Sequence, residues 1–132
     1  MKVYLFACVH NAGRSQMAAA LFNHFVREDA ACAISAGTKP ADTIHAEVSS
    51  AMVDVGIDLS PSVPQQLTPE LAETCSTVIT MGCRERCPSV PGVPVEDWPV
   101  EDPKGKTRSE VAGIRDQIKE MVHELLRRDG LC

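Results

Sequence analysis

The chain opens with a strand-length apolar run, followed at once by a loop of small and polar residues and then by a helical pattern. Residues 2–7 are rich in strand formers, and from residue 14 to about residue 26 apolar side chains recur at helical spacing. The alternation continues to the C-terminus, with strands expected at 31–36, 75–81 and 93–96 and helices at 45–55, 68–74 and 107–128. Such alternation predicts an α/β fold, a four-stranded parallel sheet flanked by helices on both faces.

The bulk properties limit the organisation and the partners of the chain. Its 132 residues contain no repeat and no linker, so residues 1–132 are expected to form a single domain. Apolar stretches are too short to span a bilayer and the N-terminus does not resemble a signal peptide, so we expect a cytoplasmic protein without a membrane partner. The net charge of −5 argues against nucleic acid as a partner and means that an anionic substrate must be held by a local site.

The loop at residues 8–15 lies where ligands bind in this architecture, at the carboxyl end of the first strand and the start of the first helix. Its backbone N–H groups can converge on one point, and the helix N-terminus adds a partial positive charge, so a tetrahedral oxyanion fits there. Small residues at Ala12 and Gly13 let the backbone approach closely, and Arg14 offers a planar fork of donors. These are the expected anion-binding residues, together with His10 and Asn11 as residues that shape the loop.

Cys8 begins this loop, and five residues separate it from Arg14. The positive field of the loop would favour the thiolate form of Cys8, the form that acts as a nucleophile, and Ser15 could donate a hydrogen bond to its sulfur. The alternative is a buried structural cysteine followed by a capping turn.

The pattern Cys-x5-Arg-Ser, placed between a first strand and a first helix, resembles the low-molecular-weight protein tyrosine phosphatase superfamily. This superfamily includes the thioredoxin-coupled arsenate reductases. Its members carry an Asp-Pro pair late in the chain, whose Asp is the general acid, and Asp102-Pro103 matches that pair. A turn-forming Asp is the alternative for Asp102, and Asp97 and Glu101 are fallback acids.

Two features favour the reductase branch of this superfamily over its tyrosine phosphatases. Phosphatases of the family typically carry aromatic residues just after the Asp-Pro pair, whereas Lys104-Gly105-Lys106 follow it here and the whole chain is 4% aromatic. The run Ser15-Gln16-Met17-Ala18 after the arginine also resembles the reductases. A phosphatase acting on phosphotyrosine or small phosphoesters stays open as the alternative function, and a non-catalytic oxyanion-binding or redox-sensing module is a third.

The resemblance also implies a thiol relay. In the resembling enzymes two cysteines after the third strand pass the oxidation outward, and Cys83 and Cys87 stand at this place. No nucleotide-binding glycine pattern is present, so we expect no cofactor, and the electrons would come from thioredoxin or another thiol donor, such as a low-molecular-weight thiol or a glutaredoxin-like protein. We expect the segment to rearrange on oxidation, because a disulfide does not fit an ideal helical turn. Zinc binding or inert thiols are the alternatives.

The remaining candidates carry less weight. Cys32 and Cys75 are expected in the core and Cys132 at the surface. Some reductases of this type hold a monovalent cation near the loop; Asn11 and Ser35 match its ligands, but Ala19 stands where a Glu is needed, so we expect no metal site. Gly13 stands where some relatives place another cysteine.

Overall fold

A computed structural model of the protein describes residues 1–83 and 90–132. Eight elements follow one another along these residues: β1 (Lys2–Cys8), α1 (Arg14–Phe25), β2 (Ala31–Gly37), α2 (Ala46–Val53), α3 (Pro69–Glu73), β3 (Thr77–Thr80), β4 (Val95–Asp97) and α4 (Arg108–Arg128). The strands form one parallel sheet in the order β2-β1-β3-β4. The predicted α/β class and four-stranded parallel sheet are therefore confirmed.

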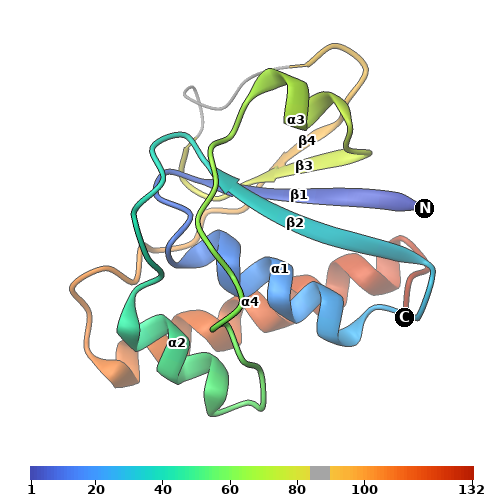
Figure 1. The fold of residues 1–132 in the computed structure, drawn as a ribbon. Helices are drawn as coiled ribbons and strands as arrows, with labels where there is room; N and C mark the ends of the chain where they lie inside the picture. Colours follow the sequence, from blue (N-terminus) through green and yellow to red (C-terminus); the bar gives the residue numbers. More distant parts are fainter. Residues whose placement is uncertain (84–89) are drawn as a thin grey trace.

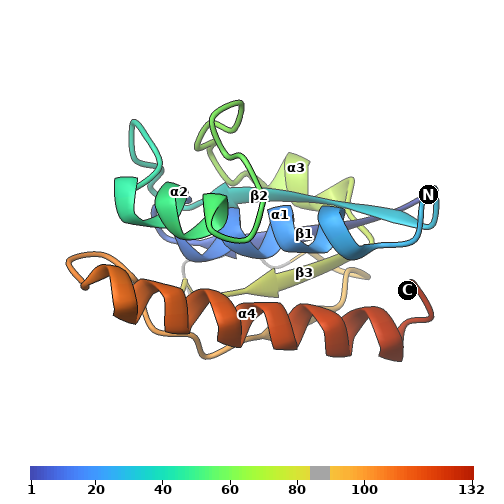
Figure 2. The ribbon, with the colours of Figure 1, turned by 90° about the horizontal axis from the view of Figure 1, so that it is seen from below.

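Helices cover both faces of the sheet. The long helix α4 runs beside α1 and α2 on one face, and the short helix α3 lies on the other (Figure 1, Figure 2). β1 is buried between them because its side chains alternate: Tyr4, Phe6 and Cys8 belong to the cluster that α1, α2 and α4 complete, whereas Leu5 and Ala7 join the cluster beneath α3. A central strand buried on both faces fixes its own register, and with it the position of the loop that follows.

The ends of several elements differ from the sequence prediction by one or two residues. The third strand begins at Thr77 rather than at residue 75, since the N–H of Cys75 donates to the carbonyl of Ala72 and so still belongs to the turn that ends α3. The last strand is Val95–Asp97 rather than 93–96, because Val93 is held in a turn by the carbonyl of Val90. These ends depend on local turns, which the apolar pattern does not reveal.

Candidate active site

The loop between β1 and α1 is held at the carboxyl edge of the sheet by the chain that follows β2. The backbone N–H groups of Thr38, Lys39 and Ala41 donate to the carbonyls of Cys8, Val9 and His10 at 3.2, 2.8 and 2.9 Å. This close approach requires Gly37, where an added Cβ would lie 2.6 Å from the carbonyl oxygen of Val9. The first half of the loop is thus fixed by backbone pairing.

The sulfur of Cys8 is buried and has two polar neighbours. The hydroxyl oxygen of Ser15 lies 2.8 Å from it, and the backbone N–H of Asn11 donates to it at 3.3 Å. Cys8 is only 2% exposed, so water competes little with these contacts. The predicted contact between Ser15 and the sulfur of Cys8 is therefore present, and the role of Cys8 as a nucleophile stays a prediction.

Asn11 organises the inner side of the loop. It is fully buried and has a positive φ of 51°, a conformation that Asn adopts more readily than most residues. Its side-chain Nδ2 donates to the hydroxyl of Ser15 at 2.7 Å, and its Oδ1 accepts from the backbone N–H of Gln65 at 2.9 Å. The side chain of Gln16 donates to the carbonyl oxygen of Asn11 at 3.0 Å and to its Oδ1 at 3.2 Å. The predicted loop-shaping role of Asn11 therefore involves two glutamines that were not singled out for it.

Arg14 opens α1 and its guanidinium is nearly buried, with 11% of its side chain exposed. Nη1 donates to the carbonyl of Val100 at 3.0 Å, and Nη2 lies 3.7 Å from a carboxylate oxygen of Asp102. The side chain passes directly over Gly82, whose missing Cβ leaves the space that the guanidinium fills. Two segments far from Arg14 in the sequence, one at Gly82 and one at 100–102, therefore fix the direction of its side chain.

The predicted acid is brought to the loop by its neighbouring proline. Pro103 is buried against Gly13, so closely that a Cβ on Gly13 would lie 2.8 Å from the proline Cγ. Asp102 itself accepts from the backbone N–H of Lys104 at 3.0 Å and keeps 44% of its side chain exposed. The carboxyl is thus partly buried and lies beside Arg14, and its role as the general acid stays a prediction.

The two fallback acids are engaged elsewhere. A carboxylate oxygen of Asp97 accepts from the hydroxyl of Thr80 at 2.8 Å, and Glu101 pairs with Lys106 at 2.6 Å. Asp102 is thus the one of these three carboxylates that the structure places against Arg14. His10 is half-buried in the loop, and its carbonyl contributes to the backbone pairing described above.

Cys83 follows β3, the neighbour of β1 in the sheet, and is 3% exposed. Its sulfur lies 3.7 Å from the carbonyl oxygen of Ala7, the residue before Cys8. Cys83 is disulfide-bonded, whereas Cys8, Cys32, Cys75 and Cys132 are free. Cys87 and its predicted rearrangement lie outside the described residues.

The other cysteines lie close to where the sequence predicted them. Cys75 is buried beneath α3, where burial raises the pKa of its thiol, and Cys132 is exposed. Cys32 lies in β2 and is half-buried rather than part of the core.

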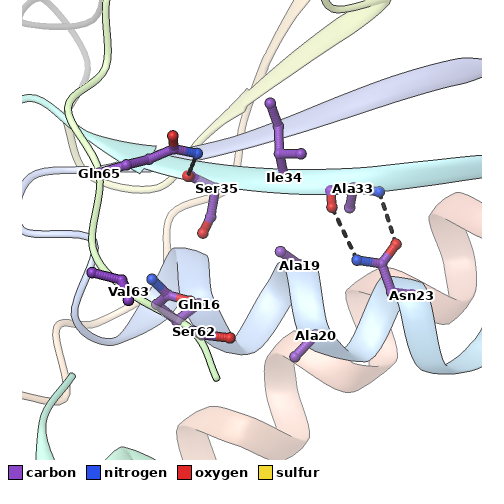
Figure 3. Close-up of a pocket in the computed structure, with 10 residues that line it drawn as sticks. All are labelled: Gln16, Ala19, Ala20, Asn23, Ala33, Ile34, Ser35, Ser62, Val63 and Gln65. Carbon is purple, nitrogen blue, oxygen red and sulfur yellow. Dashed lines mark hydrogen bonds between the residues drawn. The ribbon is translucent and has the colours of Figure 1, made fainter. Parts of the chain in front are cut away.

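A cavity lies between α1 and β2, at the place where a monovalent cation would bind near the loop. Its lining residues include Ala19, Ser35, Gln16 and Gln65 (Figure 3). The oxygens that would bind a cation already accept N–H groups: Oδ1 of Asn11 accepts two, and the carbonyl of Ser35 accepts from Nε2 of Gln65 at 2.8 Å. Ala19 offers no oxygen. The residues present therefore do not fit a cation, and across residues 1–83 and 90–132 no three His, Cys, Asp or Glu side chains gather into a metal-binding group.

A parallel sheet whose first strand runs through a Cys-x5-Arg loop into a helix defines a class of proteins that bind tetrahedral oxyanions beside a thiol. The family model described as low molecular weight phosphotyrosine protein phosphatase matches residues 3–129. The chain belongs to this family.

Relatives in this family include proteins named as arsenate reductases. A Halobacterium salinarum protein, whose name of arsenate reductase is provisional, is 39% identical over 124 residues, covering 91% of this chain and 87% of its own. Arsenate reductase from Staphylococcus aureus is 31% identical over 131 residues, covering 96% of this chain and 98% of its own.

A solved structure of an arsenate reductase is also similar to this chain. The thioredoxin-dependent arsenate reductase Cg_ArsC1' of Corynebacterium glutamicum superimposes with a TM-score of 0.83 at 36% identity over 97% of this chain. This chain spans 61% of the length of that structure's chain.

No helix in the described part of the chain is long and apolar enough to cross a bilayer.

Proposed function

We propose that this protein reduces arsenate to arsenite with electrons supplied by thiols. The observation that carries the proposal is a second cysteine close to the start of the loop: the sulfur of Cys83, which packs in the cluster beneath α3, lies 3.7 Å from the backbone carbonyl of Ala7, which directly precedes Cys8. Hydrolysis of a phosphoester needs only one nucleophilic sulfur, whereas a two-electron reduction needs a second thiol that can reach the first. The names of the Halobacterium, Staphylococcus and Corynebacterium relatives support the same substrate.

In the first step, the thiolate of Cys8 attacks the arsenic of arsenate and forms a sulfur–arsenic bond. One arsenate oxygen leaves as water, with a proton supplied by Asp102. Backbone N–H groups of residues 10–14 and the guanidinium of Arg14 hold the remaining oxygens. Asp102 lies against Arg14, so the acid and the anion-binding cation reach the same substrate.

In the second step, Cys83 attacks the sulfur of Cys8. A Cys8–Cys83 disulfide forms, the sulfur–arsenic electron pair stays on arsenic, and arsenite is released with arsenic reduced from +5 to +3. Cys87 then attacks the Cys83 sulfur, which frees the Cys8 thiolate and leaves a Cys83–Cys87 disulfide. The part of Cys87 rests on its sequence position alone.

An external dithiol closes the cycle by reducing the last disulfide, and the protein itself needs no cofactor. Thioredoxin is the reductant that we propose, in keeping with the name of the Corynebacterium relative. A low-molecular-weight thiol or a glutaredoxin-like protein is the runner-up, since either can perform the same exchange.

Phosphoester hydrolysis is the second candidate function, and the family supports it. Cys8, Arg14 and Asp102 are the groups that such a phosphatase would use, and the loop does not distinguish phosphate from arsenate by shape. The sequence 101–107 that borders the site contains no aromatic residue to hold a phenyl ring. We therefore place phosphatase activity second, as a side activity of the shared loop.

The test is NADPH consumption with arsenate, thioredoxin and thioredoxin reductase. The parent should turn over repeatedly, and Cys83→Ser and Cys87→Ser should each lose sustained turnover yet still hydrolyse an aryl phosphate. Cys132→Ser, which removes an exposed free thiol, is the matched control and should behave like the parent. Brisk aryl phosphate hydrolysis without arsenate-dependent NADPH consumption, with thioredoxin or a low-molecular-weight thiol, would reject the reductase and favour the phosphatase.

A further inference from the structure

We infer that Gln16 is a positioning residue that acts through Asn11 and Ser15 to direct the hydroxyl hydrogen of Ser15 onto the sulfur of Cys8. The inference rests on the proposed role of Cys8 as the nucleophile, and it assigns a part of the site that the chemistry above does not use. It follows from the donor and acceptor character of four linked groups.

Two backbone groups fix the orientation of both side-chain amides. A backbone carbonyl can only accept, so the atom of Gln16 that lies 3.0 Å from the carbonyl oxygen of Asn11 must be its amide nitrogen. A backbone N–H can only donate, so the atom of Asn11 that lies 2.9 Å from the N–H of Gln65 must be its amide oxygen. The usual ambiguity between amide oxygen and nitrogen is therefore resolved at both side chains.

The direction of the remaining contacts follows from these two assignments. With Oδ1 of Asn11 turned toward Gln65, its Nδ2 faces Ser15 and donates to the hydroxyl oxygen at 2.7 Å. Ser15 accepts there, so its single hydrogen is available for the sulfur of Cys8 at 2.8 Å. Together with the N–H of Asn11, the sulfur then receives two donors, an arrangement that stabilises negative charge on the sulfur.

The side chain of Gln16 stabilises this series of hydrogen bonds through Asn11. It is 5% exposed, and its amide nitrogen donates both to the carbonyl of Asn11 and, at 3.2 Å, to Oδ1. It therefore holds the backbone and the side chain of Asn11 at once, in a conformation with positive φ that few residues adopt unaided. A polar side chain on the buried side of α1 is costly unless it makes such bonds.

The test compares Gln16→Met, which keeps the length but removes the donors, with Asn23→Leu as the matched control. Asn23 lies on the same helix and also makes two amide hydrogen bonds, to the backbone N–H and carbonyl of Ala33 at 2.8 and 2.9 Å, but these do not lead to Cys8 (Figure 3). The readout is the rate of alkylation of Cys8 by iodoacetamide, followed by mass spectrometry of the Cys8 peptide, at about pH 6 and about pH 9.5.

Gln16→Met should slow the alkylation of Cys8 about tenfold at the lower pH, the effect of losing one buried hydrogen bond, and leave it close to the parent's rate at the higher pH. Asn23→Leu should match the parent at both. Gln16→Glu, which places an acceptor against the two oxygens of Asn11, should be slowed at least as much as Gln16→Met.

Three results would overturn the inference: parent-like alkylation of Cys8 in Gln16→Met at the lower pH, an equal loss in Asn23→Leu, or an equal loss at both pH values. Alkylation of the buried Cys75 in the same samples reports general loosening, and its acceleration in Gln16→Met would assign Gln16 to overall stability instead. Because iodoacetamide replaces arsenate as the electrophile, a protein that reduces no arsenate but shows this pattern would reject the proposed function alone.

Discussion

At the scale of single residues, the site places its neutral donors and its cation on different sides of the loop. Ser15 and the backbone of Asn11 face the sulfur of Cys8, whereas the guanidinium of Arg14 is directed by Val100, Asp102 and the bare backbone of Gly82. We expect the first set to affect the reactivity of the thiol and the second to affect the binding of the oxyanion, so substitutions should change the two separately.

Gly82→Ala tests the second of these sets. A Cβ at this position would collide with the guanidinium of Arg14, so the side chain must move and lose its alignment. We expect the inhibition constant of phosphate, measured against aryl phosphate hydrolysis, to rise about tenfold.

Gly56→Ala is the matched control for the strain in Gly82→Ala. Both glycines have positive φ, 96° at Gly82 and 81° at Gly56, but an added Cβ at Gly56 meets no atom within 4 Å. Gly56→Ala should lower stability by about 1 kcal/mol and leave phosphate inhibition unchanged. Equal changes in phosphate inhibition in both variants would show that backbone strain, rather than Arg14, is responsible.

The sequence was more informative about the residues expected to carry the chemistry of the loop than about the hydrogen bonds that hold the loop in shape. Cys8, Arg14 and Asp102 were found because their residue types and order carry the pattern. The donor from Gln65 was missed because it is a backbone N–H, 54 residues from Asn11, and any residue type except proline could supply it. Gln16 did leave a signal, a polar side chain among the buried positions of α1, but that signal does not name a partner.

At the scale of the elements, apolar periodicity was enough to predict each strand and helix of residues 1–83 and 90–132, and local turns determine where several of them begin or end. Residues 107–128 were expected to be helical, and α4 spans Arg108–Arg128 because Thr107 is its N-cap, with a reciprocal bond between Thr107 and Glu110. Such a cap is readable in the sequence. The turn that delays β3 to Thr77 is not, because it depends on how α3 meets the sheet.

The segment 62–67 lies beside β2, and its contact with Asn11 leads to a prediction about salt. Since Oδ1 of Asn11 already accepts from Gln65 and Gln16, turnover should not depend on a monovalent cation. Replacing potassium chloride by choline chloride at constant ionic strength should leave the rates of arsenate reduction and aryl phosphate hydrolysis unchanged. Activation several-fold by potassium but not by sodium would contradict this prediction.

At the scale of the whole molecule, one polar network joins the end of α4 to two strands of the sheet. Arg128 donates from Nη1 and Nη2 to both carboxylate oxygens of Glu96 on β4, at 3.1 and 2.9 Å, and the hydroxyl of Tyr4 on β1 donates to Asp129 at 2.6 Å. Hydrogen bonding to Asp129 adds to burial in raising the pKa of Tyr4 far above its usual value. This network holds the C-terminal end of α4 against the sheet, at the end of the sheet away from the loop. Local sequence patterns do not predict it, because Tyr4 and Glu96 are distant in sequence from Arg128 and Asp129.

Glu96→Gln tests the contribution of this network to stability. Hydrogen bonding from Arg128 lowers the pKa of the Glu96 carboxyl in the folded protein, so its ionised form stabilises the fold above the unfolded pKa of about 4.3. That contribution disappears as the pH falls through the lower folded value. We expect Glu96→Gln to reduce the free energy of unfolding by on the order of 1 kcal/mol at neutral pH, with the difference from the parent vanishing in acid.

Urea denaturation at neutral pH and at about pH 3 measures the difference. Glu120→Gln, at an exposed position of α4, is the control and should lie within experimental error of the parent. A difference for Glu96→Gln that persists or grows in acid would show that packing, rather than the charge on Glu96, is what the substitution removes.

The central claim is that electrons reach arsenic through Cys8 and Cys83, and the most direct measurement is a single turnover of the Cys87→Ser variant. The fully reduced variant is mixed with excess arsenate without a reductant, quenched with acid and alkylated. Arsenite is then counted and the disulfide-linked peptides are identified by mass spectrometry. We expect about one arsenite per protein and a disulfide that links Cys8 to Cys83. Arsenite formed with Cys8 and Cys83 both still reduced, or no arsenite from a variant that hydrolyses aryl phosphate normally, would contradict it.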